Sequence, residues 1–337
     1  MRQLTFVEPR KLEWRDVAEP KLDADIQAIV RPVAVATCDL DLALVRGTAP
    51  AGREFAFGHE GVAEVVEIGD DVGTVAPGML VSVPFQISCG QCARCVKGQT
   101  GNCESVEFLS TYGLPLGPDN GGFVSDLVRV PFADAMLVAV PEGIGPAAVA
   151  SLSDNIPDAW RTVAPQLEEY PGAPVLICAG AGSIALYASA IAVALGAERV
   201  DFAGGRPFER DIAEQLGANL ADEEFPKRLG PYPITVDASA DPDGLACALR
   251  STEPDGICTS IGIYFAPETP VPLLEMFTNG IRFHTGRAHA RPGMEPLLDL
   301  VRAGSFQPEQ VTRETAGWDD AAEAVAGHRG KLVISRD

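Results

Sequence analysis

Eight cysteines occur in the chain, and half of them fall within fifteen residues, at Cys89, Cys92, Cys95 and Cys103. Four thiolates that converge on one Zn²⁺ satisfy the tetrahedral preference of this ion. The intervening Gly90, Gly98 and Gly101 allow the backbone to turn tightly enough to bring the sulfur atoms together. We therefore expect a structural zinc site that is closed by four protein ligands. A pair of disulfides or an iron–sulfur cluster is the alternative interpretation.

A second group of residues could hold a metal with an open coordination position. Cys38 is followed twenty-one residues later by His59, and the carboxylates available to complete the set are Glu60 and Asp154. Mixed sulfur, nitrogen and oxygen ligands with a vacancy suit a catalytic zinc, because a substrate oxygen must reach the metal. Glu60 would be either a fourth ligand or the group that exchanges with substrate. Without further motifs, a Cys and a His this far apart are as often core residues as ligands.

A glycine-rich segment predicts a dinucleotide site. The apolar run 174–179 reads as a strand, and a helical pattern follows the expected loop residues Gly180, Gly182, Ser183, Ile184 and Ala185. The first glycine permits the turn, the second lets the backbone approach a pyrophosphate, and Ala185 allows close helix–strand packing. Strand and helix patterns then alternate up to residue 261, which predicts an α/β fold with a doubly wound parallel sheet.

The end of the second predicted strand bears on the choice of coenzyme. An acid that binds the ribose 2′-hydroxyl of NAD usually stands there, whereas this chain has Gly204, Gly205 and Arg206. Two glycines leave space for a 2′-phosphate and the guanidinium can bind it, so the sequence favours NADP(H) over NAD(H). If the strand ends earlier, Asp201 becomes the NAD-type acid and Arg206 a solvated residue at the start of a helix.

Composition excludes several other classes of protein. The 337 residues include 47 Asp and Glu against 26 Lys and Arg, which gives a formal net charge of −21. Such a charge repels phosphate backbones and anionic lipids, so we expect neither a nucleic acid nor a membrane as partner. No apolar stretch approaches the roughly 20 residues that a membrane span needs, and the start of the chain lacks a signal sequence, so a cytoplasmic location is expected.

These motifs, in this order, resemble the zinc-containing medium-chain alcohol dehydrogenases over essentially the whole chain. Cys38, His59 with Glu60, and Asp154 match the catalytic-zinc positions, and Asp154 places the chain near the formaldehyde, threonine and polyol dehydrogenases. The four clustered cysteines match the structural-zinc lobe of that family, and the glycine loop matches its nucleotide loop. The resemblance implies a zinc-dependent oxidoreductase that transfers hydride between NADP(H) and a small alcohol or carbonyl substrate.

The resemblance also implies an architecture. Residues 1–149 would form a GroES-like, β-rich catalytic domain with the zinc lobe at 89–103. Residues 150–287 would form a Rossmann NAD(P)-binding domain, and 288–337 would return to the catalytic domain. Two zinc ions per chain, one catalytic and one structural, and a homodimer or homotetramer are implied in the same way.

One departure from the family pattern concerns proton transfer. A Ser or Thr usually stands two residues after the first zinc cysteine, but this chain has Leu40, and the further relay position falls near Ala43. Water, a ribose hydroxyl, Asp39 or Asp41 could substitute. Alternatively, hydride passes to an iminium or a conjugated C=C bond, which needs less help from a proton donor at zinc. A cofactor-binding protein without turnover is the third hypothesis, which the complete ligand sets disfavour.

The remaining histidines are expected to be structural. His284 and His289 stand near the return to the catalytic domain, where an interface role or a position facing the nicotinamide is the alternative. His328, between Gly327 and Arg329, is predicted to mark a surface turn before the last strand.

Overall fold

The computed structural model describes residues 1–336, and the chain divides into two compact units. The first unit comprises Met1–Pro157, Ala288–Ala303 and the chain from Thr312 onward. The second comprises Asp158–Arg287 and Gly304–Val311. The chain thus passes from the first unit to the second and back to the first, and residues 304–311 contribute once more to the second. Each unit is described by itself below.

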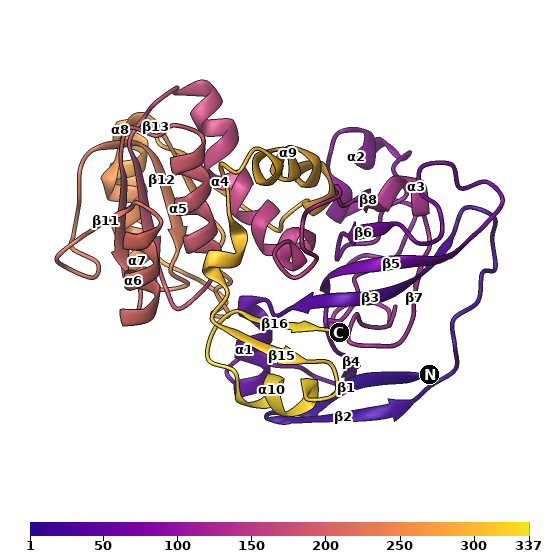
Figure 1. The fold of residues 1–337 in the computed structure, drawn as a ribbon. Helices are drawn as coiled ribbons and strands as arrows, with labels where there is room; N and C mark the ends of the chain where they lie inside the picture. Colours follow the sequence, from indigo (N-terminus) through magenta and orange to yellow (C-terminus); the bar gives the residue numbers. More distant parts are fainter. Residues whose placement is uncertain (337) are drawn as a thin grey trace. The chain divides into compact units, whose positions relative to one another are not determined.

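The first unit is built mainly from β-strands (Figure 1). A three-stranded sheet has the order β2-β1-β4, with β1 (Arg2–Glu8), β2 (Lys11–Asp16) and β4 (Phe55–Ala56). A seven-stranded sheet has the order β15-β16-β3-β5-β6-β8, with β7 paired to β3. Its strands are β3 (Ala28–Ala36), β5 (Glu60–Ile68), β6 (Leu80–Val83), β7 (Val128–Val130), β8 (Val138–Ala139), β15 (Glu314–Gly317) and β16 (Leu332–Ser335).

Short helices connect these strands. They are α1 (Asp39–Arg46), α2 (Ala93–Val96), α3 (Ala133–Met136), α9 (Ala290–Arg302) and α10 (Ala321–Gly327), with the 3₁₀ turns η1 (Thr100–Asn102) and η2 (Ala150–Ser153). Apolar side chains of the sheets fill one core, in which Phe6, Phe57 and Phe123 are at most 1% exposed. Burial of this apolar surface is the main force that stabilises the unit.

Helix α1 is capped at both ends. Cys38 is the N-cap, and its sulfur accepts the N–H of Leu40. The Asp41 carboxylate reaches back to the N–H of Cys38 at 2.8 Å, which completes a capping box. Gly47 ends the helix in the left-handed conformation, with φ of 73°. These caps fix where the Cys38 thiol lies.

The second unit contains a six-stranded parallel sheet in the order β11-β10-β9-β12-β13-β14. Its strands are β9 (Val175–Ala179), β10 (Val200–Gly204), β11 (Asn219–Leu220), β12 (Tyr232–Ala238), β13 (Thr252–Ser260) and β14 (Arg282–Thr285). Its helices are α4 (Asn155–Glu169), which begins in the first unit, α5 (Ile184–Ala194), α6 (Pro207–Gln215), α7 (Pro242–Ser251) and α8 (Leu273–Asn279), with the 3₁₀ turn η3 (Pro308–Val311).

The chain order of this sheet confirms the predicted doubly wound fold. The strands extend outward in one direction from β9 through β10 to β11, and in the other through β12 to β14. All five residues of β9 are buried; helix α5 packs against β9 and β10, and helix α7 packs against β9 and β12 (Figure 1). Cys178, Cys247 and Cys258 lie in this core as small apolar residues, as expected. A site between β9 and β12 would lie where the order of the strands reverses.

The two units do not follow the predicted residue boundaries at two places. Asp154 and the turn η2 group with the first unit, although residues 150–287 were expected to form the Rossmann domain. Residues 304–311 group with the second unit, and there the ring of Phe306 packs edge-on against Tyr187 of α5 at 6.3 Å. Turn η2 lies against β3 and β5, and turn η3 lies against α5, which accounts for both groupings.

Candidate functional site

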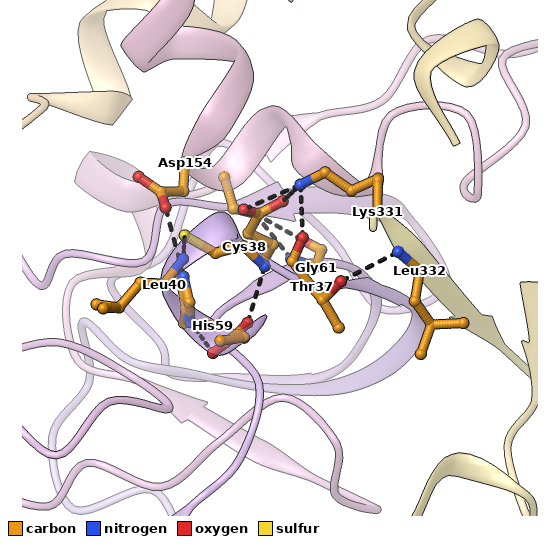
Figure 2. Close-up of polar contacts among 11 residues, drawn as sticks. Thr37, Cys38, Leu40, His59, Gly61, Asp154, Lys331 and Leu332 are labelled. Carbon is orange, nitrogen blue, oxygen red and sulfur yellow. Dashed lines mark hydrogen bonds and ion pairs between the residues drawn. The ribbon is translucent and has the colours of Figure 1, made fainter. Parts of the chain in front are cut away.

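The four predicted ligands of the open metal site come together in the first unit. One ligand atom from each of Cys38, His59, Glu60 and Asp154 lies within 4.8 Å of the others. Cys38 precedes α1, His59 and Glu60 stand at the start of β5, and Asp154 follows η2. Figure 2 shows the Cys38, His59 and Asp154 side chains pointing toward one another.

Local backbone geometry explains how these elements meet. Gly58, directly before His59, has φ of 93°, a conformation that side chains rarely allow. After Glu60, the N–H of Gly61 donates to the Ser153 hydroxyl at 2.9 Å, and that hydroxyl donates to the Gly61 carbonyl at 3.1 Å. These hydrogen bonds fasten the start of β5 to η2, so that Asp154 lies beside His59.

The buried imidazole of His59 has a carboxylate on each side. Its Nε2 lies 3.4 Å from Asp154 Oδ2, and its Nδ1 lies 3.6 Å from Asp41 Oδ1. Neither ring nitrogen has a hydrogen bond with good geometry, although both are buried. A metal ligand commonly shows this arrangement, because one ring nitrogen faces the ion while a carboxylate orients the other.

The carboxylate of Glu60 has a cationic partner from the far end of the sequence. Lys331 Nζ lies 3.1 Å and 3.4 Å from the two oxygens of Glu60 and donates to the Thr37 carbonyl at 2.6 Å (Figure 2). Both side chains are at most 1% exposed. Lys331 therefore offsets the charge of Glu60 and holds it at the edge of the ligand group.

The electrostatics of the ligand group fit a divalent cation. Burial and, after it, the charges of Asp154 and Glu60 raise the pKa of the Cys38 thiol far above its usual range. Burial alone would lower the pKa of His59, but the carboxylates of Asp41 and Asp154 raise it to about 9. Burial raises the pKa of Glu60 to about 7 against the opposing charge of Lys331. Negative groups thus crowd the site, and Zn²⁺ bound among them would offset their repulsion.

The four clustered cysteines also converge. One sulfur from each of Cys89, Cys92, Cys95 and Cys103 lies within 4.8 Å of the others. Among residues 1–336, all eight cysteines are free of disulfide bonds. The alternative interpretation, a pair of disulfides among these four cysteines, is therefore wrong.

Hydrogen bonds point toward these sulfur atoms. The N–H groups of Cys92 and Cys95 donate to Cys89 and Cys92 at 3.3 Å and 3.4 Å, and the Ser105 hydroxyl donates to Cys89 at 3.2 Å. Burial alone would raise the pKa of Cys89, but these and other hydrogen bonds lower it to about 6. Donors of this kind stabilise thiolates, the form in which cysteine binds zinc.

The predicted coenzyme loop joins β9 to α5 at the carboxyl edge of the parallel sheet. A Cβ atom on Gly180 would lie 2.5 Å from the Ser239 carbonyl, so only glycine fits there. Gly182 and Ser183 follow in the loop, Ile184 begins α5, and Ala185 is 1% exposed against the sheet. The loop has the strand–turn–helix context that a pyrophosphate site requires.

The end of β10 lies beside this loop. Gly204 and Gly205 have φ of 79° and 75°, and Arg206 is the N-cap of α6. The Arg206 guanidinium forms an ion pair with Glu209 at 2.7 Å and lies 3.3 Å from the Ala181 carbonyl. Asp201 stands three residues before the end of β10.

Three comparisons with known proteins bear on these sites. The model of the alcohol dehydrogenase GroES-like domain matches residues 24–142. The chain is 34% identical over 234 residues to the glutathione-independent formaldehyde dehydrogenase of Pseudomonas aeruginosa, covering 66% of this chain but 58% of that enzyme. It is 32% identical over 228 residues to the medium chain reductase/dehydrogenase ucsI of Acremonium sp., covering 66% of this chain and 76% of that protein.

The chain belongs to the zinc-type medium-chain alcohol dehydrogenase family. Among solved structures, the alcohol dehydrogenase TADH from Thermus sp. ATN1 is 25% identical, covers both chains completely and has a TM-score of 0.86. The first unit is thus the GroES-like domain of this zinc-dependent oxidoreductase. Its zinc sites are the structural four-cysteine cluster and the catalytic Cys–His–carboxylate group, and its coenzyme is a nicotinamide dinucleotide.

Two contributors to the catalytic site of this dehydrogenase were not predicted in their observed roles. Asp41 was considered only as a proton donor, yet it caps α1 and faces His59. Its position three residues after Cys38 is a capping-box signal that could have revealed the first of these roles. Lys331 was not singled out, because nothing in the local sequence links it to Glu60, 271 residues earlier.

The three histidines outside the metal site differ in their surroundings. His289 Nδ1 accepts the N–H of Gly101 at 3.0 Å, which ties the start of α9 to the zinc lobe. His284 is exposed on β14. The expected surface position of His328 is wrong: the side chain is 3% exposed, and its Nδ1 lies 2.6 Å from the Val325 carbonyl. The ring is buried at the C-cap of α10.

Among residues 1–336, no helix combines the length and the apolar character that crossing a bilayer requires.

Proposed function

We propose that this enzyme transfers hydride between NADP(H) and an alcohol or carbonyl substrate. The observation that supports this coenzyme preference is the end of β10, where no acidic residue stands and the Arg206 guanidinium follows two glycines. The rings of Phe225 and Phe202 fill the places that side chains at Gly204 and Gly205 would take, so any phosphate site there depends on Arg206. That guanidinium is about one-third exposed and lies near the glycine loop, so it is accessible to a 2′-phosphate.

The environment of Asp201 supports the same proposal. Its carboxylate accepts hydrogen bonds from Arg199 at 2.6 Å, Tyr232 at 2.7 Å and Asn219 at 3.1 Å. A carboxylate engaged by three side chains within the strand is a poor candidate for binding a ribose at the strand end. The Arg206–Glu209 ion pair argues in the other direction, since Glu209 reduces the positive charge available to a phosphate.

Titration with NADPH and with NADH, followed by nicotinamide fluorescence, tests the preference. We expect tighter binding of NADPH in the wild type. The double substitution Arg206→Gln/Glu209→Gln removes both charges and leaves no buried carboxylate unpaired. It should weaken NADPH binding about tenfold or more and leave NADH binding almost unchanged, since hydrogen bonds to charged groups contribute ~1.5–3 kcal/mol. Tighter binding of NADH by the wild type would overturn the proposal.

The catalytic site supports the alcohol–carbonyl part of the proposal. Bound zinc supplies a Lewis acid that lowers the pKa of an alcohol or polarises a carbonyl oxygen. Cys38, His59 and Asp154 would hold the ion, Asp41 would orient the imidazole, and Lys331 would keep Glu60 in place beside the ligands. Loss of turnover in Cys38→Ser with an unchanged circular dichroism spectrum is the expected result, and full activity would refute it.

A second candidate function follows from Leu40. This half-buried side chain packs against the core at the start of α1, where it supplies no hydroxyl for proton transfer. A reductase of iminium or conjugated C=C bonds on the same scaffold would need less proton transfer at zinc. Leu40→Ser distinguishes the two: a gain in alcohol oxidation supports a missing relay, whereas an unchanged rate weakens the idea.

We also propose that two copies of the chain associate through the second unit, in a homodimer or a homotetramer. Leu273, Leu274 and Phe277 on α8 are 67%, 78% and 84% exposed. Strand β14 forms the adjacent edge of the sheet, and pairing with its own copy across a two-fold axis would extend the sheet and cover these side chains. Light scattering should give at least twice the 35.5 kDa chain mass, and Phe277→Glu should lower it.

A further inference from the structure

A buried carboxylate that the zinc chemistry does not use lies at the coenzyme edge of the parallel sheet. Asp237 is the sixth residue of β12 and is completely buried. It pairs with Cys178 of β9 on one side and with Ser260 of β13 on the other. Because β9 and β12 flank the point where the strand order reverses, Asp237 stands where such sheets bind dinucleotides.

Both oxygens of this carboxylate are saturated with hydrogen bonds. Oδ1 accepts the hydroxyl of Ser239 at 2.6 Å and its N–H at 3.1 Å. Oδ2 accepts the hydroxyls of Ser260 at 2.6 Å and Tyr264 at 2.8 Å. Within the described residues, no lysine or arginine forms an ion pair with it. Burying a charge without a cation is costly, and these four hydrogen bonds are what compensates for it.

The donors belong to two different loops. Ser239 follows β12, whereas Ser260 and Tyr264 stand at the end of β13 and in the segment after it. Burial and then the charge of Asp237 raise the pKa of Tyr264 far above its usual range, so its hydroxyl remains a donor at neutral pH. One carboxylate therefore fastens both loops to the end of β12.

These loops press against each other and against the glycine loop. The Ser239 carbonyl lies so close to Gly180 that no Cβ fits there, and Gly180 donates its N–H to the Ala238 carbonyl at 3.1 Å. A Cβ on Gly262 would lie 3.0 Å from the backbone of Ala240, which has φ of 53°. A left-handed alanine is strained and persists only when its surroundings impose it.

The residues on either side of Tyr264 point outward. Ile263 and Phe265 are 53% and 56% exposed, while the Tyr264 hydroxyl between them reaches inward to Asp237. The anchor thus holds two apolar side chains at the carboxyl edge of β13. In a doubly wound sheet, the strands β12 to β14 form the second mononucleotide-binding half, opposite the half that starts with the glycine loop.

We propose that Asp237 is a positioning residue for the nicotinamide half of the coenzyme site, and that it acts by fastening the loops after β12 and β13 to each other. The proposal rests on the nicotinamide coenzyme of the proposed function. It does not depend on which of the two dinucleotides is preferred, because that choice is made at the end of β10.

The test compares the whole coenzyme with its adenosine half. Calorimetry measures the Kd of NADPH and of 2′,5′-ADP for the wild type and for Asp237→Asn, or of NADH and ADP if the wild type prefers NADH. An amide replaces an acceptor with a donor that faces hydroxyl groups, so we expect the NADPH Kd to rise about tenfold or more. The Kd of 2′,5′-ADP should change less than about twofold, because its phosphates would bind at the glycine loop and at Arg206, outside the two loops that Asp237 fastens.

Two further variants keep the test decisive. Tyr264→Phe removes a single hydroxyl from a partly exposed residue and should shift the same ratio in the same direction even if Asp237→Asn fails to fold. Asp241→Asn makes the matched change in the same turn, on an exposed carboxylate that caps α7 by accepting the N–H of Asp243 at 2.8 Å. It should leave the ratio of the two Kd values unchanged.

An equal rise in the Kd of NADPH and of 2′,5′-ADP, or no rise in either, would overturn the proposal. A failure of the NADP preference would appear separately, as tighter binding of NADH by the wild type.

Discussion

At the residue scale, the catalytic site depends on side chains that are not themselves proposed ligands. Asp41 accepts the N–H of Cys38 and lies 3.6 Å from His59 Nδ1, so one carboxylate stands beside two proposed ligands at once. Lys331 holds the carboxylate of Glu60 in place through a buried ion pair. A site in which the ligands are held before the metal arrives loses less entropy on binding it.

Asp41→Asn tests this role directly. The amide oxygen can still accept the N–H of Cys38, but the charge beside His59 is lost. We expect the affinity of the catalytic site for zinc to fall by about 10–100-fold. Competition with a chromogenic chelator measures this, and Asp71→Asn, the same change in an exposed loop, is the control. Chelation curves that coincide for both variants would contradict the role.

Lys331→Met leaves the buried Glu60 without its cation. Removing one partner of a buried ion pair costs about 3–5 kcal/mol, so the free energy of unfolding in urea should fall by that order. Adding Glu60→Gln removes the unpaired charge and should restore most of the loss. Lys21→Met, at an exposed position, should change little. Failure of the second substitution to restore stability would show that the ion pair is not the cause.

At the element scale, the sequence predicted what short segments encode. The cysteine spacing, the Gly–His–Glu motif and the strand–loop–helix at 174–196 are each set within one stretch of chain, and the structure has the expected elements there. Lys331 could not be predicted, because it meets Glu60 only where β16 pairs antiparallel with β3, and that pairing depends on the whole sheet. His328 was misjudged for a similar reason, since its burial comes from packing that a Gly-His-Arg-Gly segment does not reveal.

The zinc lobe is the element whose stability should depend most on metal. Its helices α2 and η1 have four and three residues, so they bury too little apolar surface to be stable without a crosslink. Cys92→Ala should reduce the zinc content from about two ions to one per chain and lower the melting temperature. Atomic absorption and calorimetry measure the two effects. Retention of both values would mean that the lobe does not rely on a fourth thiolate.

At the scale of the whole molecule, one buried histidine should affect the dependence of stability on pH. Burial lowers the pKa of His328 below its ordinary value of 6.5. As the pH falls below 6.5, His328 is therefore protonated more readily in the unfolded chain than in the folded chain. The neutral, buried His328 contributes fully to stability above pH 6.5, and this contribution is lost as the pH falls below 6.5.

His328→Asn keeps a donor for the Val325 carbonyl but cannot be protonated in this range. Between pH 7.5 and 5.5, the melting temperature of this variant should therefore fall less than that of the wild type. Lys21→Met, at an exposed position that does not titrate in this range, serves as the control and should follow the wild type. A slope for His328→Asn equal to that of the control would remove His328 as the cause.

The ion pair between Glu60 and Lys331 also sets an order of events during synthesis. All four cysteines of the zinc lobe have been made by residue 103, whereas Lys331 follows Glu60 by 271 residues. At translation rates of about 5–20 residues per second, roughly 10–50 seconds separate the two partners on the ribosome. The nascent chain can thus load its structural zinc early, while the catalytic centre is completed only when Lys331 and β16 emerge.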